Sequence, residues 1–188
     1  FYESSRYHNC VFVGRDRTGK ARFASMRGTM GDFKQDVAGS DKRFNFCFPA
    51  CDPKSRTVEV FESAIEGLSV ATLRKAGLLD EPGGPPWDGR HYLALSGTSP
   101  LALLQFLHDH PEVDRVALRL NNDKAGRDGM EKIEAAIHED RALQGRALTV
   151  EQKPPPTRYG KDYNQMLGGK LAERSAPAHA CKERSVTR

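Results

Sequence analysis

Residues 57–68 read Thr-Val-Glu-Val-Phe-Glu-Ser-Ala-Ile-Glu-Gly-Leu. The stretch from Thr57 to Phe61 is rich in β-branched residues and predicts a strand. In residues 63–76 apolar side chains recur at helical spacing, and Gly77 ends the predicted helix. A strand followed at once by a helix is the start of a βαβ unit, so this segment predicts a parallel sheet.

The alternation of strands and helices continues to about residue 172. Further strands are expected at residues 91–95, 115–120 and 147–151. One helix begins at Pro100, with Ser99 as its N-cap, and ends before Pro111. Two more helices are expected, at residues 124–139 and from about Tyr163 onward. This order predicts an α/β fold with a mainly parallel sheet and helices on both faces.

The two ends of the chain have a different character. Residues 11–13 and 21–24 flank a turn and predict a hairpin, and a further strand is expected at residues 43–48. The last residues mix Ala, Ser, Pro and charged side chains without a period. We therefore expect a β-rich region at residues 1–56, an α/β domain at 57–170 and a disordered basic tail at 171–188.

Composition argues against several classes of protein. Of the 188 residues 38% are hydrophobic, and no uncharged apolar run reaches about 18 residues, so we expect no membrane-spanning helix. The first residues show no charged segment followed by an apolar one, so we expect no secretory signal. Four cysteines are too few for a disulfide scaffold, and Cys47 and Cys51 lack a second pair at zinc-like spacing. We expect reduced thiols in a cytoplasmic protein, and because the chain lacks a start Met we expect either a processed chain or a fragment of a longer one.

The charges are unevenly distributed along the chain. Residues 1–56 carry a net charge of +5, residues 57–169 a net charge of −4 and residues 170–188 a net charge of +3. Basic flanks around an acidic middle would suit a polyanion held beside metal-binding carboxylates. Ordinary solvated faces are the alternative interpretation.

Polar residues follow the ends of the predicted strands. Glu62 comes directly after the first strand, with Glu66 one helical turn later. Asn121 and Asp123 follow the third strand, and Asp162 follows the proline run after the fourth. Sites in such sheets form beyond the carboxyl ends of the strands, and a group of oxygen ligands there suits Mg²⁺.

Most of these carboxylates also have a purely structural alternative. Ser63 and Glu66 fit a capping box. Asp123 and Asp162 could each cap the helix that follows. Glu62 is harder to explain in this way, because a carboxylate directly after an apolar strand loses hydration unless something binds it.

Three motifs of the α/β part resemble the Toprim domain, the metal-binding unit shared by bacterial primases, type IA and type II topoisomerases and several nucleases. They lie at residues 58–69, at 120–127 (Leu-Asn-Asn-Asp-Lys-Ala-Gly-Arg) and at 160–164 (Gly-Lys-Asp-Tyr-Asn). The resemblance covers residues 57 to about 167. Segments at 11–16, 27–29 and 39–44 further resemble a family of uncharacterised Toprim-like proteins that is common on bacterial mobile elements.

The resemblance implies Mg²⁺ or Mn²⁺ as cofactor, held by the motif residues Glu62, Asn121, Asp123 and Asp162. It also implies Glu62, Asp123 and Lys161 as candidate catalytic residues, with Glu62 as general base or metal ligand. Asn121 departs from the family pattern, because it stands where the first Asp of an Asp-x-Asp motif belongs. A lost carboxylate weakens a metal site and counts against a two-metal mechanism, which leaves a one-metal or degenerate site.

The basic residues point to DNA or RNA as partner. Lys124, Arg127 and Lys161 lie in or beside the motifs and would neutralise phosphate charge. The basic N-terminal region offers further candidate contacts: Arg15, Arg17, Arg22, Arg27, Lys42 and Arg43. Other replication or mobilisation proteins are further expected partners.

The function expected from these features is Mg²⁺-dependent phosphodiester chemistry on nucleic acid, either primase-like nucleotidyl transfer or nuclease-type cleavage. The alternative is a non-catalytic nucleic-acid-binding module with a degenerate metal site. A generic nucleotide-binding α/β domain ranks last, because the chain has neither a Walker-type loop nor a Gly-x-Gly-x-x-Gly loop.

Overall fold

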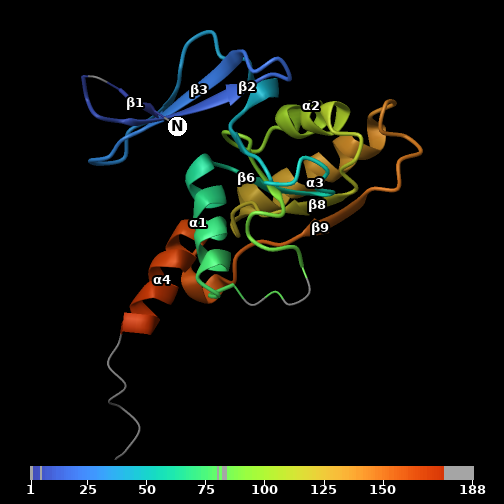
Figure 1. Cartoon of the computed structure of the whole chain (residues 1–188). Coiled ribbons are helices and arrows are strands. Elements are labelled where there is room, and N and C mark those ends of the chain that lie inside the picture. Colours follow the sequence, from blue (N-terminus) through green and yellow to red (C-terminus); the bar gives the residue numbers. More distant parts are fainter. Residues whose placement is uncertain (1, 5, 80, 82–83, 176–188) are drawn as a thin grey trace, which may run out of the picture.

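The computed structural model describes residues 2–4, 6–79, 81 and 84–175, which form two β-sheets and four α-helices (Figure 1). The larger sheet, sheet B, has the strand order β5-β7-β6-β8-β9. Its bounds are β5 Cys47–Phe48, β6 Thr57–Phe61, β7 His91–Ala94, β8 Arg115–Leu118 and β9 Thr149–Gln152. Strands β7, β6, β8 and β9 are parallel, and only β5 runs antiparallel to its neighbour. The predicted α/β fold with a mainly parallel sheet is confirmed.

Helices cover both faces of sheet B. The bounds are α1 Ala64–Lys75, α2 Leu101–Asp109, α3 Lys124–Glu139 and α4 Tyr163–Ser175. Side chains alternate between the faces along a strand. Val58 and Val60 of β6 accordingly pack with apolar residues of α2 and α3, whereas Phe61 packs with residues of α1 and α4. The central strands β6 and β7 are buried on both faces, as parallel sheets require, whereas the edge strand β9 is mostly exposed.

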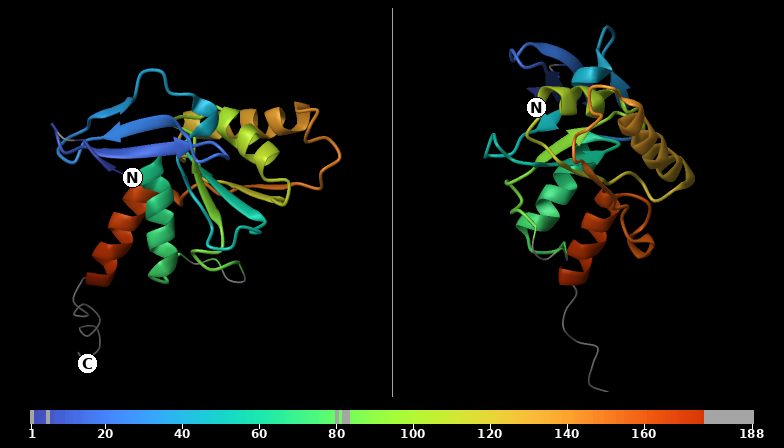
Figure 2. Two further views of the ribbon diagram at one scale, coloured as in Figure 1. Left: turned by 45° about the horizontal axis from the view of Figure 1, so that its top comes forward. Right: turned by 90° about the vertical axis from the view of Figure 1, so that its right-hand side faces the viewer.

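The N-terminal residues form sheet A, an antiparallel sheet in the order β1-β2-β3-β4. Its bounds are β1 Tyr2–Glu3, β2 Cys10–Arg15, β3 Ala21–Arg27 and β4 Lys34–Asp36, and the β2–β3 pair is the predicted hairpin. Phe12 is buried against Ala64 at the start of α1 and Ala94 at the end of β7. Sheet A therefore lies across the end of sheet B where β6 and β7 finish, as Figure 2 shows.

One glycine sets how closely sheet A approaches the segment that follows it. A Cβ on Gly14 would lie 1.7 Å from the carbonyl oxygen of Phe44, so no larger residue fits between β2 and that segment without backbone movement.

Several predicted boundaries are wrong. The strand expected at residues 43–48 is mostly absent, because Lys42–Phe44 forms a 3-10 turn whose Asp41 side chain accepts a hydrogen bond from the Arg43 N–H. Only Cys47–Phe48 of that stretch pairs in a sheet. Helix α2 begins at Leu101 with Pro100 as N-cap, so Ser99 does not cap it. Strand β9 begins at Thr149, because residues 141–145 form a turn and the Leu148 N–H then donates to the Arg146 carbonyl instead of to a strand.

Two further expectations concern the C-terminal tail and membrane-spanning helices. Most of the predicted disordered tail, residues 176–188, lies outside the described residues, and helix α4 includes residues 171–175. Within the described part of the chain, no helix has the length and apolar character needed to cross a membrane.

A buried ion network lies on the α1/α4 face of sheet B. Glu59 of β6 accepts hydrogen bonds from Arg74, Arg90 and Arg119, and its side chain is 1% exposed. Burial raises the pKa of Glu59, but the three guanidinium groups outweigh it and hold the pKa below its usual value. Arg119 also donates to the hydroxyl of Tyr163, the first residue of α4. The network thus ties α4 to the strands.

Candidate functional site

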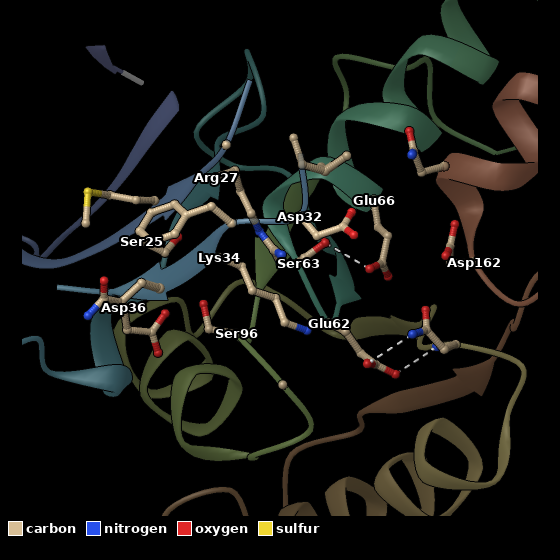
Figure 3. A pocket seen from close by; sticks show the side chains of 18 of the residues that line it. Ser25, Arg27, Asp32, Lys34, Asp36, Glu62, Ser63, Glu66, Ser96 and Asp162 are labelled. Carbon is tan, nitrogen blue, oxygen red and sulfur yellow. Dashed lines mark hydrogen bonds between the residues drawn. The ribbon is translucent and has the colours of Figure 1, made fainter. Parts of the chain in front are cut away.

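A cavity of about 840 Å³ lies between sheet A and the carboxyl ends of the parallel strands (Figure 3). We call it the carboxylate cavity, after the acidic side chains in its wall. Its lining includes the polar side chains of Arg27, Lys34, Glu62, Glu66, Asn121 and Asp162. Glu62, Asn121 and Asp162 are three of the four metal ligands expected from the sequence, and the structure brings them into one wall.

Glu62 follows β6 directly, and Asn121 follows the neighbouring parallel strand β8. The Asn121 backbone N–H donates to Oε1 of Glu62 at 3.0 Å, and its side-chain Nδ2 donates to Oε2 at 3.1 Å. Burial raises the pKa of Glu62; the Asn121 N–H opposes this rise, and the negative charges of Asp123 and Asp162 add to it. The carboxylate is therefore oriented by one residue, and the positive charge of Lys161 partly offsets the two acids.

Glu66 does not form the capping box that the sequence offered as an alternative. Helix α1 has no side-chain cap, and the Ser63 hydroxyl instead donates to Oε1 of Glu66 at 2.8 Å. Oε2 of Glu66 is buried and has no hydrogen-bond partner among the described residues. Burial raises the pKa of Glu66 to about 7, and the charges of Glu62 and Asp162 contribute. The cavity therefore favours a proton or a cation at this carboxylate.

Asp123 and Asp162 both act as helix caps. Asp123 Oδ1 accepts from the Gly126 N–H at 2.9 Å at the start of α3, and Asp162 Oδ1 accepts from the Gln165 N–H at 2.8 Å at the start of α4. Asp162 also lines the carboxylate cavity, whereas Asp123 is not among the described residues that line it. The negative charge of Asp123 contributes to the raised pKa of Glu62. The role of Asp123 as a metal ligand stays a prediction.

The opposite wall comes from sheet A. Arg27 pairs with Lys34 and Ser25 with Asp36 across β3 and β4, so these side chains share the face that carries the buried Phe23. In Figure 3, Arg27 and Lys34 point from these strands toward the side where Glu62 and Glu66 lie. Lys34 was not predicted as a functional residue. The alternation along the hairpin was visible in the sequence, but not which face meets the α/β domain.

Three cations line the carboxylate cavity without a salt bridge to any described residue: Arg27, Lys34 and Lys161. The other predicted nucleic-acid contacts lie elsewhere or are paired. Lys42 is 3.1 Å from Asp36, and Arg43 is 2.7 Å from Asp41.

The remaining basic candidates lie away from this cavity. Lys124 forms a pair with Asp128 at 2.6 Å, and Arg127 donates to the side chain of Asn122. Arg15 and Arg43 line a second cavity. The structure therefore does not gather the predicted basic residues into one surface.

Whether the residues suit a metal ion depends on their oxygen atoms. No group of three His, Cys, Asp or Glu side chains in the described ranges is placed to hold an ion, which also applies to the cysteines at 10, 47 and 51. However, Oδ1 of Asn121 and Oε2 of Glu66 are buried oxygens without a hydrogen-bond partner within the same residues. Oxygen ligands from one or two carboxylates suit Mg²⁺, which keeps several waters. The donor set fits one hard cation, and it does not fit a pair bridged by several carboxylates.

The fold and the cavity define an α/β domain whose candidate site lies at the carboxyl ends of its parallel strands, beneath a second, smaller sheet. Residues 59–167 match the model of the family described as Toprim-like, and residues 1–54 match the family described as Protein of unknown function (DUF3991). The first match covers more than half of the chain. The chain belongs to the Toprim-like family, which confirms the resemblance drawn from its motifs.

One protein is similar to this chain in sequence, and two solved structures are similar to it in fold. An uncharacterized protein of Bacillus anthracis is 26% identical over 151 residues, 70% of this chain and 39% of that protein. The primase fragment of the bacteriophage T7 primase-helicase is similar in structure, with a TM-score of 0.59 and 16% identity over 91% of this chain and 64% of that one. The DnaG primase catalytic domain bound to ssDNA gives a TM-score of 0.51 and 12% identity over 88% of this chain and 51% of that one.

These similarities differ in what they establish. At such low identity the structural neighbours show the fold alone. The chain spans less than two thirds of the length of each of these three proteins.

Proposed function

We propose that this chain is the core of a nucleic-acid-processing protein of a mobile element, which carries out Mg²⁺- or Mn²⁺-dependent phosphodiester chemistry in the carboxylate cavity. The observation that carries the proposal is the pairing of opposite charges across one space. Glu62, Glu66 and Asp162 lie on one side, together with Lys161, and Arg27 and Lys34 lie on the other. The sheet A side also carries Asp32 and Asp36, of which Asp36 is paired with Lys42. Phosphoryl transfer needs both, because acids hold a metal ion while cations neutralise the phosphate.

The family and the structural neighbours support primase-like nucleotidyl transfer ahead of nuclease-type cleavage. The chain is a member of the Toprim-like family, and two of its structural neighbours are a primase fragment and a primase catalytic domain that was bound to ssDNA. We therefore propose DNA or RNA as partner, a cytoplasmic location, and further replication or mobilisation proteins as companions.

Within this proposal, Glu62 and Asp162 would hold one metal ion, with Oδ1 of Asn121 as a neutral third ligand. When bound, the ion would supply positive charge beside the transferring phosphate. The Asn121 N–H groups keep the Glu62 carboxylate in a fixed orientation through two hydrogen bonds. Asp123 would contribute negative potential from its capping position.

The cations of the cavity would bind the substrate. Arg27 and Lys34, one on each of two paired strands, would contact phosphate oxygens from the sheet A side. Lys161 precedes the capping residue Asp162 and would contact them from the opposite side. A strand of nucleic acid held in this way would place a phosphate between the two walls, which is the positioning that phosphoryl transfer mainly requires.

A specific observation favours a second candidate, a non-catalytic nucleic-acid-binding module. Asn121 replaces a carboxylate of the family motif, and no three acidic, His or Cys side chains in the part of the chain described here form a metal site. Such a module would use the cations of the carboxylate cavity to bind nucleic acid and would not catalyse phosphodiester chemistry.

The test measures chemistry and binding on the same samples. Primer synthesis on a single-stranded DNA template, and cleavage of labelled single-stranded DNA and RNA, are assayed with Mg²⁺ or Mn²⁺. We expect one of these activities in the wild type and a loss of about 100-fold or more in Glu62→Gln, since removing one electrostatic contributor costs this order. Fluorescence anisotropy should show that this variant still binds the oligonucleotide.

The control is Glu139→Gln, which changes an exposed acid at the end of α3. It should leave both activity and binding unchanged. Binding without synthesis or cleavage in either metal would favour the non-catalytic module. Absence of binding at low salt would show that both candidates are wrong.

A further inference from the structure

Sheet A has one face against the α/β domain and one face turned away from it. The first face carries Phe12, which packs on Ala64 and Ala94, and the four described α-helices all lie on that side of the sheet (Figures 1 and 2). We call the opposite side the outer face. Successive residues of a strand point to opposite faces, and residues paired directly across antiparallel strands share a face. The strand register therefore assigns each side chain of sheet A to one of the two faces.

The register gives the outer face an apolar surface. One row crosses all four strands in the order Tyr2, Val11, Met26, Gln35. The large apolar side chains that the pairing assigns to this face are Tyr2, Val11, Val13, Met26, Phe33 and Val37.

Phe33 and Val37 belong to this face because they continue β4 in register at its two ends. The Phe33 carbonyl accepts from the Gly28 N–H, and the Val37 N–H donates to the Ala24 carbonyl, each at 2.8 Å. A Cβ on Gly28 would lie 3.2 Å from the Cβ of Phe33, which shows that the two positions face the same side.

The apolar side chains of the outer face are exposed. Tyr2 is 57% exposed, Phe33 45% and Val37 38%. Val11 and Met26 are half-buried, and neither belongs to a buried apolar cluster of the described residues. An antiparallel sheet with one solvated face normally presents polar side chains there. A contiguous apolar surface in that place marks an interaction site.

The charges of the outer face argue against nucleic acid as its partner. Of the residues paired within sheet A, as far as the structure describes it, Arg15 is the only charged one on this face, and it donates to the Tyr2 hydroxyl at one corner. Arg22, which a bulge leaves without a pair, lies over the Phe44 ring. Binding of a polyanion depends on cations at the contact surface. An uncharged apolar face instead fits the apolar surface of a protein.

The long row of the outer face is complementary to itself. Its ends carry the Tyr2 hydroxyl and the Gln35 amide, and its middle consists of Val11 and Met26. A second copy turned by 180° about an axis parallel to the strands places Tyr2 opposite Gln35 and Val11 opposite Met26, twice in each dimer. The hydroxyl and the amide can hydrogen-bond at both rims, while the apolar side chains meet in the centre.

The size of the outer face suits a weak association. Four strands about 4.8 Å apart and about five residues long give a flat footprint of about 300 Å². Two adjacent turns extend it at one end, because Tyr7 is 65% and Met30 93% exposed, and the Thr29 hydroxyl joins these turns by donating to the His8 carbonyl at 3.1 Å. Standard interfaces bury about 800 Å² on each partner, so we expect micromolar affinity.

We propose that the outer face of sheet A binds a second copy of this chain in a symmetric dimer. The two sheets would pack face to face about 10 Å apart, with β2 of one copy over β3 of the other. This dimer does not depend on the function proposed for the carboxylate cavity. Met26, Phe33 and Gln35 also border that cavity at the edge strand β4, so the test measures oligonucleotide binding as well.

The test is sedimentation velocity of the full chain from about 10 µM to 1 mM, with a reductant because Cys51 is exposed. We expect a monomer–dimer equilibrium with a Kd on the order of 10–100 µM. Val11→Lys and Met26→Asp should each weaken the dimer about 100-fold, because each places a charge against an apolar side chain. Leu171→Lys changes an exposed apolar residue on α4 and should leave the equilibrium unchanged.

A mixture of two variants tests the register of the dimer. When Val11→Lys and Met26→Asp are mixed in equal amounts, the two introduced charges face each other once, and the second contact between positions 11 and 26 is native. The mixture should therefore sediment as a dimer at concentrations where each variant alone is a monomer. If either variant fails to fold by circular dichroism, the exposed pair Phe33→Gln with Val37→Gln replaces it and should weaken the dimer about tenfold.

Three results would overturn the proposal. A wild type that stays monomeric at about 1 mM would assign the outer face to a different protein. A dimer that persists in both charge variants would place the interface elsewhere. Unchanged sedimentation together with lost binding of a labelled single-stranded oligonucleotide in these variants would make nucleic acid the occupant.

Discussion

Asn121 holds both oxygens of Glu62, one through its backbone N–H and the other through its side-chain Nδ2. Asn121, the residue that departs from the family motif, is thus the residue that orients the carboxylate of Glu62. Its own Oδ1 is buried and has no partner among the described residues. The substitution removes a charge and, in exchange, fixes the position of a neighbour.

Asn121→Asp should tighten Mg²⁺ binding. The change replaces the Nδ2 donor with a second carboxylate beside Glu62, and an added charge attracts a divalent ion by the order of a few kcal/mol at an effective dielectric near 20. We expect affinity to rise about tenfold or more in calorimetric titration. Without metal, the variant should unfold at lower urea than the wild type, because like charges then face each other. Equal affinity would show that residue 121 does not contact the ion.

Glu66→Gln should alter the pH dependence of stability. The pKa of Glu66 is raised from 4.5 to about 7, so the folded protein holds a proton that the unfolded chain has lost between these values. The wild type therefore loses stability as pH rises through this window, by up to about 3 kcal/mol. Urea unfolding should show Glu66→Gln more stable than the wild type at pH 8 and similar to it near pH 4.5. A difference independent of pH would contradict the assignment; Glu139→Gln serves as control.

Arg27→Gln and Lys34→Gln should each weaken binding of single-stranded nucleic acid. Each lost phosphate contact should reduce the slope of log K against log salt by about 0.7. Anisotropy over a salt series measures both affinity and slope, and Arg141→Gln should leave both unchanged. A chelator should leave wild-type binding largely intact, because these contacts come from sheet A and not from the acids. Unchanged slopes in both variants would remove sheet A from the binding surface.

Glu59→Gln should destabilise the fold strongly. Breaking a buried ion pair costs about 3–5 kcal/mol, because the remaining charges stay buried without compensation. Here Arg74, Arg90 and Arg119 would be left without their shared acceptor, and among the residues that the structure describes only Glu81 would still offset two of them. Urea denaturation measures the loss, with Glu139→Gln as a surface control expected within about 0.5 kcal/mol of the wild type. A small effect would show that the network does not stabilise α4.

The elements with a clear period were predictable from the sequence. Strand β6 and helix α3 have the predicted bounds, because each combines a regular apolar pattern with a distinct end signal. The strand expected at residues 43–48 failed, because the alternating phenylalanines suggested a strand while the Asp41 side chain stabilises a turn there. The hydrogen bond to the Asp41 side chain stabilises the turn more than the alternating phenylalanines favour a strand. The spacing of apolar residues alone does not show which of the two prevails.

The acidic wall of the site was predictable, and the basic wall was less so. Glu62 and Asn121 follow neighbouring parallel strands, and parallel strands end at the same edge. Arg27 and Lys34 reach the site only because one face of sheet A packs on α1, which depends on tertiary contacts of Phe12. Glu59 and Arg119 lie within predicted strands, and their partners come from distant segments, so their pairing was not visible in the sequence.

Sheet A packs over the ends of the parallel strands, so the Toprim-like region cannot be transferred to another protein alone without losing part of its cavity. The two matched families meet at residues 55–58, and the carboxylate cavity takes Arg27 and Lys34 from one side of that border and Glu62, Glu66 and Asp162 from the other. A Toprim-like segment moved into another protein would bring Glu62, Glu66 and Asp162 without Arg27 and Lys34, and it would expose Ala64 and Ala94, which now lie under Phe12. A transfer that keeps both walls of the carboxylate cavity therefore has to carry the two regions together.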